Sequence, residues 1–287
     1  MLTKILLLGS SGMLGSYISR NLEIDGVELI PASRESIDDF DFNKPDKVIT
    51  FIKSVKPAII INAVACISLD FCEKNPALSR QVNSITPSII SQYCQNNKIY
   101  FIHISTDHFF SDNKDKKHSE DSMVSIVNQY AASKFEAENR ILENKEALIL
   151  RTSIIGRTSK KKSFLDWAIN QIESRQNINL FDDSYSSFMH CKQFVSLLKI
   201  LILKQASGLY NVASSDVFSK ADFVIKLASL MNIKITYQLT SVNNLKIKRA
   251  NSCGLDTKKI INEYKIVCPS FDEVVNCSFN ELEQSKD

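Results

Sequence analysis

Three of the seven glycines in this 287-residue chain lie within seven residues of one another, at Gly9, Gly12 and Gly15. They directly follow the apolar residues 5–8, a run typical of a buried parallel strand. Glycine allows tight turns and close approach of the backbone to another group, so a glycine-poor chain that gathers it here has a local backbone requirement. The pattern predicts a strand, a tight turn and the start of a helix.

Apolar runs and helical periodicity alternate through the first half of the chain. Strands are expected at residues 4–8, 27–30, 58–62, 99–104 and 147–150, and helices at residues 14–22, 46–53, 76–94 (with a break at Pro87) and 128–144. This alternation predicts an α/β fold, a Rossmann-like doubly wound parallel sheet covered by helices on both faces.

After Arg151 the alternation is less regular, which indicates a smaller C-terminal substrate-binding lobe. Helices are expected here at residues 164–174, 192–204 and 219–231, and a strand at 209–213. The expected division is a nucleotide-binding domain of residues 1–155, to which residues 184–215 return, and a substrate-binding lobe of residues 156–183 and 216–287.

Composition excludes several classes of protein. The net charge of +3, from 35 basic and 32 acidic residues, is too balanced to indicate nucleic-acid binding. No apolar run reaches 18 residues, and the apolar stretch near the start is too short for a signal peptide. The seven cysteines form no CxxC pair, which favours reduced thiols in the cytoplasm over a disulfide framework or a metal site.

The glycine spacing is GxxGxxG, which suits the diphosphate of a dinucleotide: the turn lets the backbone approach it, and the helix N-terminus offers free N–H groups. An ordinary glycine turn is the alternative interpretation. At the end of the second strand, Ser33 and Arg34 suit the 2′-phosphate of NADP, whereas the acidic side chain of Glu35 favours NAD. NADPH is therefore the expected cofactor, and NADH is the alternative. Arg34 has an alternative interpretation too, as a solvated surface charge without a role in binding.

A second group of residues carries acid–base chemistry. Tyr130 and Lys134 lie four residues apart, on one face of the expected helix. An ammonium group at that distance lowers the pKa of a tyrosine and lets it exchange a proton near neutral pH. Thr106 follows the strand at residues 99–104, where its hydroxyl group can reach the same substrate oxygen.

These motifs, in this order, resemble the extended short-chain dehydrogenase/reductases, and within them the dTDP-4-dehydrorhamnose reductase family. The similar stretches are residues 9–15, 40–42, 62–65, 82–83, 105–110, 128–134, 151–153, 181–183 and 249–256, together with Asp70, Glu73 and Pro76. The resemblance implies cofactor contacts from Gly9, Ser11, Gly12, Met13, Leu14, Gly15, Ser33, Arg34, Asp41, Phe42, Asn62, Ala63, Val64, Ala65, Asn83, Tyr130 and Lys134.

The resemblance also implies a reaction: NADPH gives hydride to the C4 ketone of a nucleotide-linked 4-keto-6-deoxy sugar, in the synthesis of a deoxysugar for a surface polysaccharide such as an O-antigen. Tyr130 then protonates the oxygen, Lys134 holds the nicotinamide ribose and lowers the pKa of Tyr130, Thr106 polarises the ketone and Asp107 orients the sugar. The implied substrate-binding residues are Thr106, Asp107, His108, Ser153, Ile154 and Arg249, the last of these for the charge of the nucleoside diphosphate.

The chain also departs from its relatives. His108 stands where related dehydratases carry a glutamate, which argues against dehydration, and Ile154 replaces a tryptophan common near the sugar. Met13 stands where the family usually has glutamine, and no magnesium ligands can be mapped. Two alternatives stay open: a nucleotide-sugar C4 epimerase on the same fold, and a non-catalytic NADP-binding regulatory subunit. A monomer or a homodimer without nucleic-acid or membrane partners is expected.

Overall fold

The computed structural model describes residues 2–37, 40–111, 114, 116–158 and 163–284. The chain forms two compact units, which are described separately below. Unit 1 consists of residues 1–106, 127–151 and 195–210, and unit 2 of residues 107–126, 152–194 and 211–287. Unit 2 thus includes residues 107–126, which lie inside the nucleotide-binding domain expected above; the expected domain boundaries stay a prediction.

Unit 1 is built on a six-stranded sheet in the order β11-β6-β4-β3-β1-β2. The strands are β1 (Thr3–Leu8), β2 (Val27–Ala32), β3 (Ile59–Asn62), β4 (Tyr100–Ile104), β6 (Leu148–Arg151) and β11 (Gly208–Asn211). The pairings from β2 to β6 are all parallel. Their register aligns Leu8 with Ala32 and Asn62, and Asn62 with His103, so these residues form a row at the carboxyl ends of four strands.

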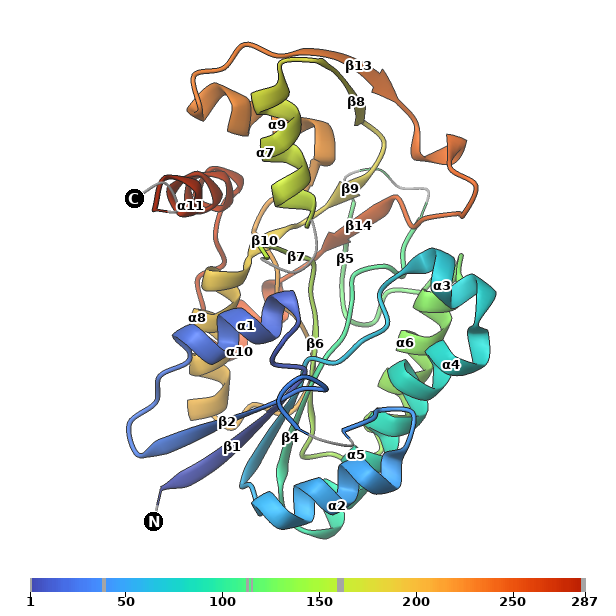
Figure 1. Cartoon of the computed structure of the whole chain (residues 1–287), viewed down its shortest axis with the longest axis vertical. Helices are drawn as coiled ribbons and strands as arrows, with labels where there is room; N and C mark the ends of the chain where they lie inside the picture. Colours follow the sequence, from blue (N-terminus) through green and yellow to red (C-terminus); the bar gives the residue numbers. More distant parts are fainter. Residues whose placement is uncertain (1, 38–39, 112–113, 115, 159–162, 285–287) are drawn as a thin grey trace. The chain divides into compact units, whose positions relative to one another are not determined.

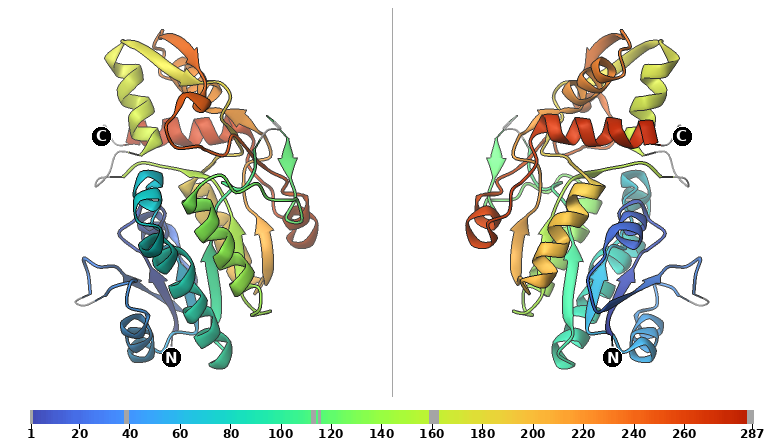
Figure 2. Two further views of the ribbon diagram at one scale, coloured as in Figure 1. Left: turned by 90° about the vertical axis from the view of Figure 1, so that its right-hand side faces the viewer. Right: turned by 90° about the vertical axis from the view of Figure 1, so that its left-hand side faces the viewer.

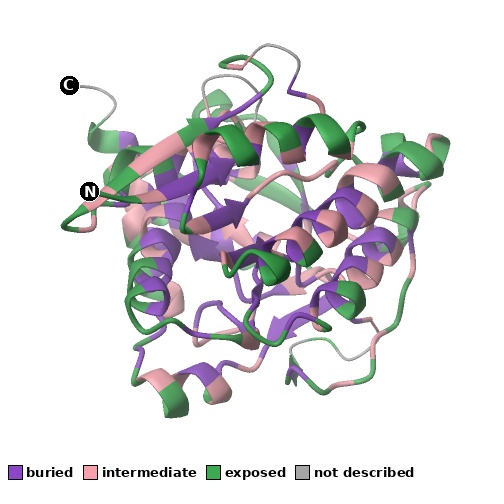
Figure 3. Ribbon diagram, turned by 90° about the horizontal axis from the view of Figure 1, so that it is seen from below, coloured by how far each residue is buried: buried purple, intermediate pink, exposed green. Residues whose placement is uncertain are grey.

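Helices cover both faces of this sheet, which confirms the expected doubly wound α/β fold (Figures 1 and 2). α1 (Met13–Asn21) and most of α8 (Cys191–Leu203) lie on one face, and α2 (Pro45–Val55), α5 (Thr86–Asn96) and α6 (Gln129–Ile141) lie on the other. Two short helices, α3 (Leu69–Lys74) and α4 (Pro76–Arg80), precede α5 and pack near α6. The helices carry buried residues toward the sheet and exposed residues on their outer sides (Figure 3).

The expected break at Pro87 is wrong, because the irregular turn lies before the proline and not at it. A π-helical turn, Gln81–Ile85, joins α4 to α5, and Pro87 lies in the first turn of α5. Proline is tolerated in that position because a first-turn N–H needs no partner within the helix. The wide turn before it, of a kind often found at functional sites, supplies Asn83, whose side chain is used in the candidate site described below.

Unit 2 contains short strands, helices and a 3-10 helix at Val242–Asn244. A four-stranded sheet has the order β12 (Phe218–Ser219), β9 (Tyr185–Ser186), β14 (Ser252–Leu255) and β5 (Lys117–His118). β7 (Ile154–Ile155) pairs with β10 (Met189–His190), and β8 (Asn177–Phe181) with β13 (Thr236–Thr240). The helices are α7 (Phe164–Ser174), α9 (Lys220–Leu230), α10 (Lys258–Tyr264) and α11 (Phe271–Gln284).

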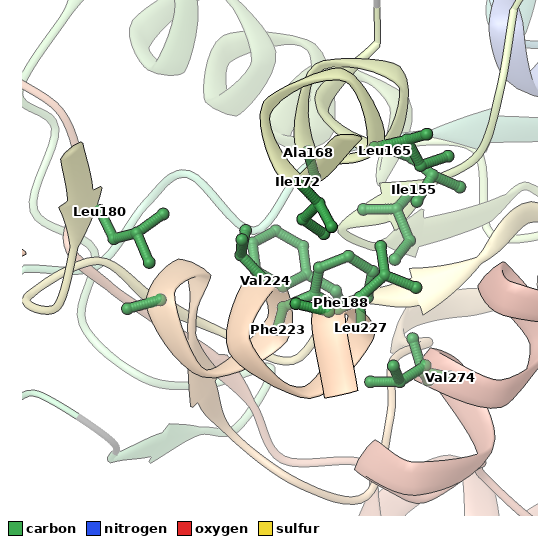
Figure 4. Packing of buried hydrophobic residues seen from close by; sticks show 14 of the residues in the cluster. Ile155, Leu165, Ala168, Ile172, Leu180, Phe188, Phe223, Val224, Leu227 and Val274 are labelled. Atoms are coloured by element: carbon green, nitrogen blue, oxygen red, sulfur yellow. The ribbon is translucent and has the colours of Figure 1, made fainter. Parts of the chain in front are cut away.

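The core of unit 2 lies between α7, α9 and α11 (Figure 4). Leu165, Phe223 and Val274, one from each helix, are fully buried in it. α7 and α9 each begin with a capping box, Ser163 with Asp166 and Ser219 with Asp222, which fixes where the two helices start. In the described part of the chain, we find no helix with the length and apolar character needed to span a membrane.

Candidate active site

In the glycine turn between β1 and α1, backbone segments approach each other so closely that a Cβ on Gly9 or Gly15 would collide with them. Gly9 has φ +89°, and a Cβ there would lie 2.9 Å from the carbonyl carbon of Ala63 and from the backbone nitrogen of Val64. A Cβ on Gly15 would lie 2.1 Å from the carbonyl oxygen of Gly9. The turn is therefore pressed against the end of β3 and against the first turn of α1.

The N-terminus of α1 is open to an anion. Gly12 is the N-cap residue, no side chain caps the helix, and its first turn contains no acidic residue. Ser11 and Met13 are half-buried on either side of Gly12, and Leu14 is buried under the turn. First-turn N–H groups have no partner inside a helix, so this turn can bind the diphosphate of a dinucleotide. The residues present therefore fit the cofactor that the sequence predicts.

The variant Gly15→Ala tests whether the glycine turn binds the dinucleotide. The added methyl group forces the turn away from α1, and we expect the affinity for NADPH to fall about 10- to 100-fold, as when a charge-assisted hydrogen bond is lost. Titration of the protein with NADPH by calorimetry measures the effect. Gly26→Asn is the matched control, because Gly26 has φ +74°, which asparagine tolerates, and a Cβ added there meets no atom within 4 Å. Wild-type affinity in Gly15→Ala would contradict the assignment of the turn.

The end of β2 carries the residues expected at the adenosine ribose. Ser33 is buried, and its hydroxyl oxygen lies 3.1 Å from that of Ser36 and accepts a hydrogen bond from the N–H of Glu35. Arg34 and Glu35 are both exposed, so either charge can face a ligand at this edge.

Asp41 and Phe42 follow on the same edge of unit 1. The Asp41 carboxylate accepts hydrogen bonds from the backbone and side-chain nitrogens of Asn43, each at 2.9 Å, and the backbone bond is the main cause that lowers its pKa. Phe42 is buried and packs in the core with Phe40, while its carbonyl oxygen accepts a bond from Thr86. The contact of both residues with adenine stays a prediction.

Asn83 holds the segment after β3 against α6. Its Oδ1 accepts a hydrogen bond from the N–H of Cys66 at 2.7 Å, and its Nδ2 donates to the carbonyl oxygen of Cys66 and to the Ser133 hydroxyl group, each at 3.0 Å. Ala63, Val64 and Ala65 lie half-buried on this segment. The expected cofactor contact of Asn83 stays a prediction; its hydrogen bonds hold the segment that follows β3 in place.

α6 carries Tyr130 and Lys134. Asn128 caps the helix by accepting a hydrogen bond from the N–H of Ala131, so Tyr130 lies in the first turn, where it is half-buried. Lys134 is 1% exposed, and its Nζ donates to the carbonyl oxygen of Ile104 at 2.7 Å and lies 2.9 Å from Nε2 of His103. Burial lowers the pKa of Lys134 to about 7, which suits proton exchange near neutral pH.

A buried ion pair fixes α6 against the ends of β4 and β6. Glu138 and Arg151 are 1% and 3% exposed, with Nη2 of Arg151 2.7 Å from Oε2 of Glu138. The Ser105 hydroxyl group donates to the same carboxylate at 2.5 Å. Ser105 is followed by Thr106, which is also buried, so the ion pair helps to fix the position of the Thr106 hydroxyl group.

Asp107 lies at the centre of a polar cluster in unit 2. Its carboxylate accepts a hydrogen bond from the Ser186 hydroxyl group at 2.6 Å, and burial raises its pKa although the bonds from Ser186 and Ser153 act in the opposite direction. Burial lowers the pKa of His108 to about 4, helped by the positive charges of Lys220 and Arg249. A neutral imidazole and two cations around a carboxylate can bind hydroxyl groups and the charge of a phosphate.

The remaining predicted residues also lie in unit 2. Ser153 accepts a backbone hydrogen bond from Met189 at 2.8 Å, and Ile154 pairs with Met189 in the β7–β10 ladder. Arg249 is exposed, on the segment that leads to β14.

Lys220 is a member of this cluster that the sequence does not predict. It is the first residue of α9, directly after the N-cap residue Ser219. Burial lowers its pKa, helped by the positive charge of Arg249, although Asp107 acts in the opposite direction. The sequence shows only a helix start there, with no motif that marks the lysine. Among the described residues, no group of three histidine, cysteine, aspartate or glutamate side chains is arranged to hold a metal ion.

Together, the glycine turn, the parallel sheet and the buried lysine of α6 define a Rossmann-type nucleotide-binding protein with the tyrosine–lysine pair of short-chain dehydrogenase/reductases. Comparison with known families agrees: the model described as RmlD substrate binding domain matches residues 3–284. The chain belongs to this family, the dTDP-4-dehydrorhamnose reductase family that its motifs resemble.

Individual relatives and solved structures are similar over most of the chain. The probable low-salt glycan biosynthesis reductase Agl14 of Haloferax volcanii is 26% identical over 246 residues, covering 82% of each protein. The dTDP-4-dehydrorhamnose reductase of Escherichia coli K12 is 25% identical, covering 97% of each. A crystal structure of dTDP-4-dehydrorhamnose reductase from Bacillus anthracis in complex with NADP has a TM-score of 0.89 at 22% identity, covering 98% of this chain and 100% of that one. This likeness shows that the fold is the same.

Proposed function

We propose that the protein is an NADPH-dependent reductase, which transfers hydride to the C4 ketone of a nucleotide-linked 4-keto-6-deoxy sugar in deoxysugar and polysaccharide biosynthesis. The observation that carries the proposal is Lys134, buried at the end of β4 with a pKa of about 7 and one helical turn from Tyr130. The names of the relatives, a glycan biosynthesis reductase and a dTDP-4-dehydrorhamnose reductase, supply the class of substrate.

Bound NADPH supplies the hydride ion. The glycine turn and the α1 N-terminus would hold its diphosphate, Ser33 and Arg34 its 2′-phosphate, and residues 62–65 the middle of the molecule. Lys134 and Tyr130 would lie at the nicotinamide half. The close packing of the backbone around Gly9 and Gly15, where a Cβ has no space, supports this assignment.

The chain's own residues handle the substrate oxygen. Tyr130 donates its phenolic proton to the C4 oxygen as negative charge develops there, and the Thr106 hydroxyl group donates a hydrogen bond to the same atom. Asp107 and His108 bind sugar hydroxyl groups, and Arg249 and Lys220 bind the diphosphate of the sugar nucleotide. Ile154 forms the wall beside the sugar, where a tryptophan is common in the family, and we therefore assign the class of sugar rather than dTDP-4-dehydrorhamnose itself.

The remaining expectations belong to this proposal. We expect the protein to act on a nucleotide sugar in the cytoplasm, as a monomer or homodimer and without a nucleic-acid partner. These properties agree with a small biosynthetic reductase. The C4 epimerase and the non-catalytic subunit are the two alternatives, and the assay described below distinguishes them.

The choice of NADPH over NADH is predicted to depend on Arg34. Replacement by glutamine removes the planar cation that pairs with the 2′-phosphate, and the KM for NADPH should rise about 10- to 100-fold, the value of one charge-assisted contact. The KM for NADH should stay within about twofold. Steady-state kinetics with both cofactors measure this, with Lys74→Gln as a control in the same unit, since Lys74 is exposed and forms a surface ion pair with Asp70 of its own helix. An equal change for both cofactors would contradict the assignment.

The reaction itself is tested by NADPH consumption with dTDP-4-keto-6-deoxyglucose, with and without a 3,5-epimerase. Consumption in either case supports the reductase, and dependence on the epimerase identifies the rhamnose-type sugar as the substrate. Turnover of sugar without loss of NADPH, with NAD(H) retained through purification, would replace the proposal by the epimerase. NADPH binding without turnover of dTDP-, UDP-, GDP- or CDP-linked keto-sugars would replace it by the non-catalytic subunit.

A further inference from the structure

Two cysteine side chains meet where the chain leaves β3 and enters α3. Sγ of Cys72 lies 3.8 Å from Sγ of Cys66, and it donates a hydrogen bond to the carbonyl oxygen of Cys66 at 3.4 Å. Both side chains are free thiols. Cys66 directly follows residues 62–65, to which the proposed function assigns the middle of the cofactor. The proposed reaction uses neither thiol, so this pair is available for a chemistry of its own.

The backbone holds the two sulfur atoms close to each other. On one side, Asn83 accepts a hydrogen bond from the N–H of Cys66 at 2.7 Å and donates one to its carbonyl oxygen at 3.0 Å. On the other side, Ser68 caps α3, and its carbonyl oxygen accepts from the N–H of Cys72 at 2.9 Å. The sulfur atoms of a disulfide are about 2.0 Å apart. The remaining approach is one that rotation of the two side chains about their Cα–Cβ bonds can largely cover.

The two thiols differ in their access to a reagent. Cys66 is half-buried and the next residue, Ile67, is 70% exposed, whereas Cys72 is completely buried. Burial raises the pKa of Cys72 to about 12, and Cys66 adds to this shift while the Ser79 hydroxyl group acts against it. A buried, protonated thiol reacts slowly with reagents from solution. A small reagent therefore meets Cys66 first, and Cys72 reacts with the sulfur atom that already lies beside it.

We propose that Cys66 and Cys72 form a reversible modification site, at which a small disulfide from solution closes a disulfide bond that weakens the binding of NADPH. The proposal goes beyond the proposed function and rests on it only for the contact of residues 62–65 with the cofactor. Disulfides in the cytoplasm are commonly transient ones of this kind, which respond to the redox state of the small thiols around the protein.

The modification takes two thiol–disulfide exchange steps. The Cys66 sulfur, as a thiolate, attacks one sulfur of the small disulfide, breaks its S–S bond and releases one small thiol, which takes up the proton of Cys66. The Cys72 sulfur then attacks the Cys66 sulfur and releases the second small thiol, which takes up the proton of Cys72. The protein loses two electrons and two protons, and the small disulfide gains both. An excess of a dithiol reverses the two steps.

The new bond acts on the cofactor site through the segment of residues 62–65. This segment is packed against the glycine turn, since a Cβ on Gly9 would lie 2.9 Å from the carbonyl carbon of Ala63 and from the backbone nitrogen of Val64. The disulfide draws Cys66 toward α3 and removes one of the two hydrogen bonds to its carbonyl oxygen. A shift of the segment therefore also disturbs the glycine turn. We expect the Kd for NADPH to rise about two- to tenfold, the value of one neutral hydrogen bond.

Mass spectrometry of the wild-type protein tests whether the bond forms. Both cysteines lie on one tryptic peptide, residues 54–74, because Pro57 protects Lys56 from cleavage. The folded protein is incubated with bis(2-hydroxyethyl) disulfide, denatured in acid, alkylated with N-ethylmaleimide and digested. We expect a peptide that is two hydrogen atoms lighter and unalkylated, and that regains two alkylated thiols after treatment with dithiothreitol. A peptide that stays fully alkylated, or that carries only a mixed disulfide, would overturn the proposal.

Single variants test the order of the two steps. Cys72→Ser stops the reaction after the first step and should trap the mixed disulfide on Cys66, whereas Cys66→Ser should leave Cys72 as a free thiol. Either result supports the order, so one folded variant suffices. Cys277→Ser is the matched control, because Cys277 is the other half-buried cysteine of the seven, and its peptide of residues 54–74 should close as in the wild type. Modification of Cys72 in Cys66→Ser, or a Cys72→Ser protein without the adduct, would overturn the proposal.

Titration with NADPH then connects the bond to the cofactor. The wild type is titrated by calorimetry in the reduced and the disulfide form, and Cys66→Ser is titrated before and after the same oxidation. We expect the two- to tenfold loss of affinity only in the disulfide form of the wild type, with recovery after dithiothreitol. A closed bond with unchanged affinity, or an equal loss in Cys66→Ser, would overturn the proposal. A failure of the proposed function would appear differently, as this redox-dependent binding of NADPH in a protein that reduces no keto-sugar.

Discussion

Replacement of Tyr130 by phenylalanine lowers kcat/KM for the keto-sugar by roughly 10²- to 10⁴-fold, the usual value of a positioned general acid. Only the hydroxyl group is lost, and the ring stays in the first turn of α6, so the affinity for NADPH and the melting temperature should remain close to those of the wild type. Initial rates of NADPH oxidation at saturating cofactor, together with an NADPH titration, measure both quantities.

Tyr93→Phe is the matched control, because Tyr93 is also half-buried, on the neighbouring helix α5, where its ring packs against Lys53. This variant should retain the wild-type rate. If Tyr130→Phe turns over as fast as Tyr93→Phe, Tyr130 is not the general acid of the reaction, which contradicts its assigned role.

The second large effect is expected on stability. Replacement of Arg151 by methionine leaves the Glu138 carboxylate buried without its cation, and breaking a buried pair in this way costs about 3–5 kcal/mol. In a protein of this size, the melting temperature should fall by roughly 10 °C. Thermal unfolding followed by circular dichroism, together with urea titration, measures the loss.

The exposed pair of Arg80 and Glu136 on the outer side of α6 is the comparison, and Arg80→Met should change the melting temperature much less. Because the penalty comes from an unpaired buried charge, Arg151→Met combined with Glu138→Leu should recover part of the stability. If Arg151→Met and Arg80→Met unfold at the same temperature, the ion pair does not anchor α6 in the way described.

The fold is predictable because its signals are local. The glycine turn, the apolar strands and the capping residue Asn128 each act within a few neighbouring residues, and their order along the chain indicates a parallel doubly wound sheet. Pro87 shows the limit: the sequence predicts a break there, whereas the helix continues through the proline after a π-helical turn, in which Asn83 bonds to residues far away in the sequence.

The polar contacts of the site are less predictable, because they depend on pairing between elements far apart in sequence. His103 alternates with apolar residues in its strand, a pattern that by itself indicates a structural role. Its ring meets Lys134, 31 residues later, and Asn62, 41 residues earlier. The same holds for Lys220, since only the folded unit 2 places a lysine from the start of α9 in the surroundings of Asp107.

The transfer of a labelled hydride tests the central claim most directly. The protein is incubated with NADPH carrying deuterium at the transferred position of C4 and with the nucleotide-linked 4-keto-6-deoxy sugar, and the product is examined by NMR and mass spectrometry. The account predicts one deuterium at C4 of the sugar for each NADPH oxidised. Sugar that is converted without gaining deuterium, or labelled NADPH that is left unconsumed with every keto-sugar offered, would contradict it.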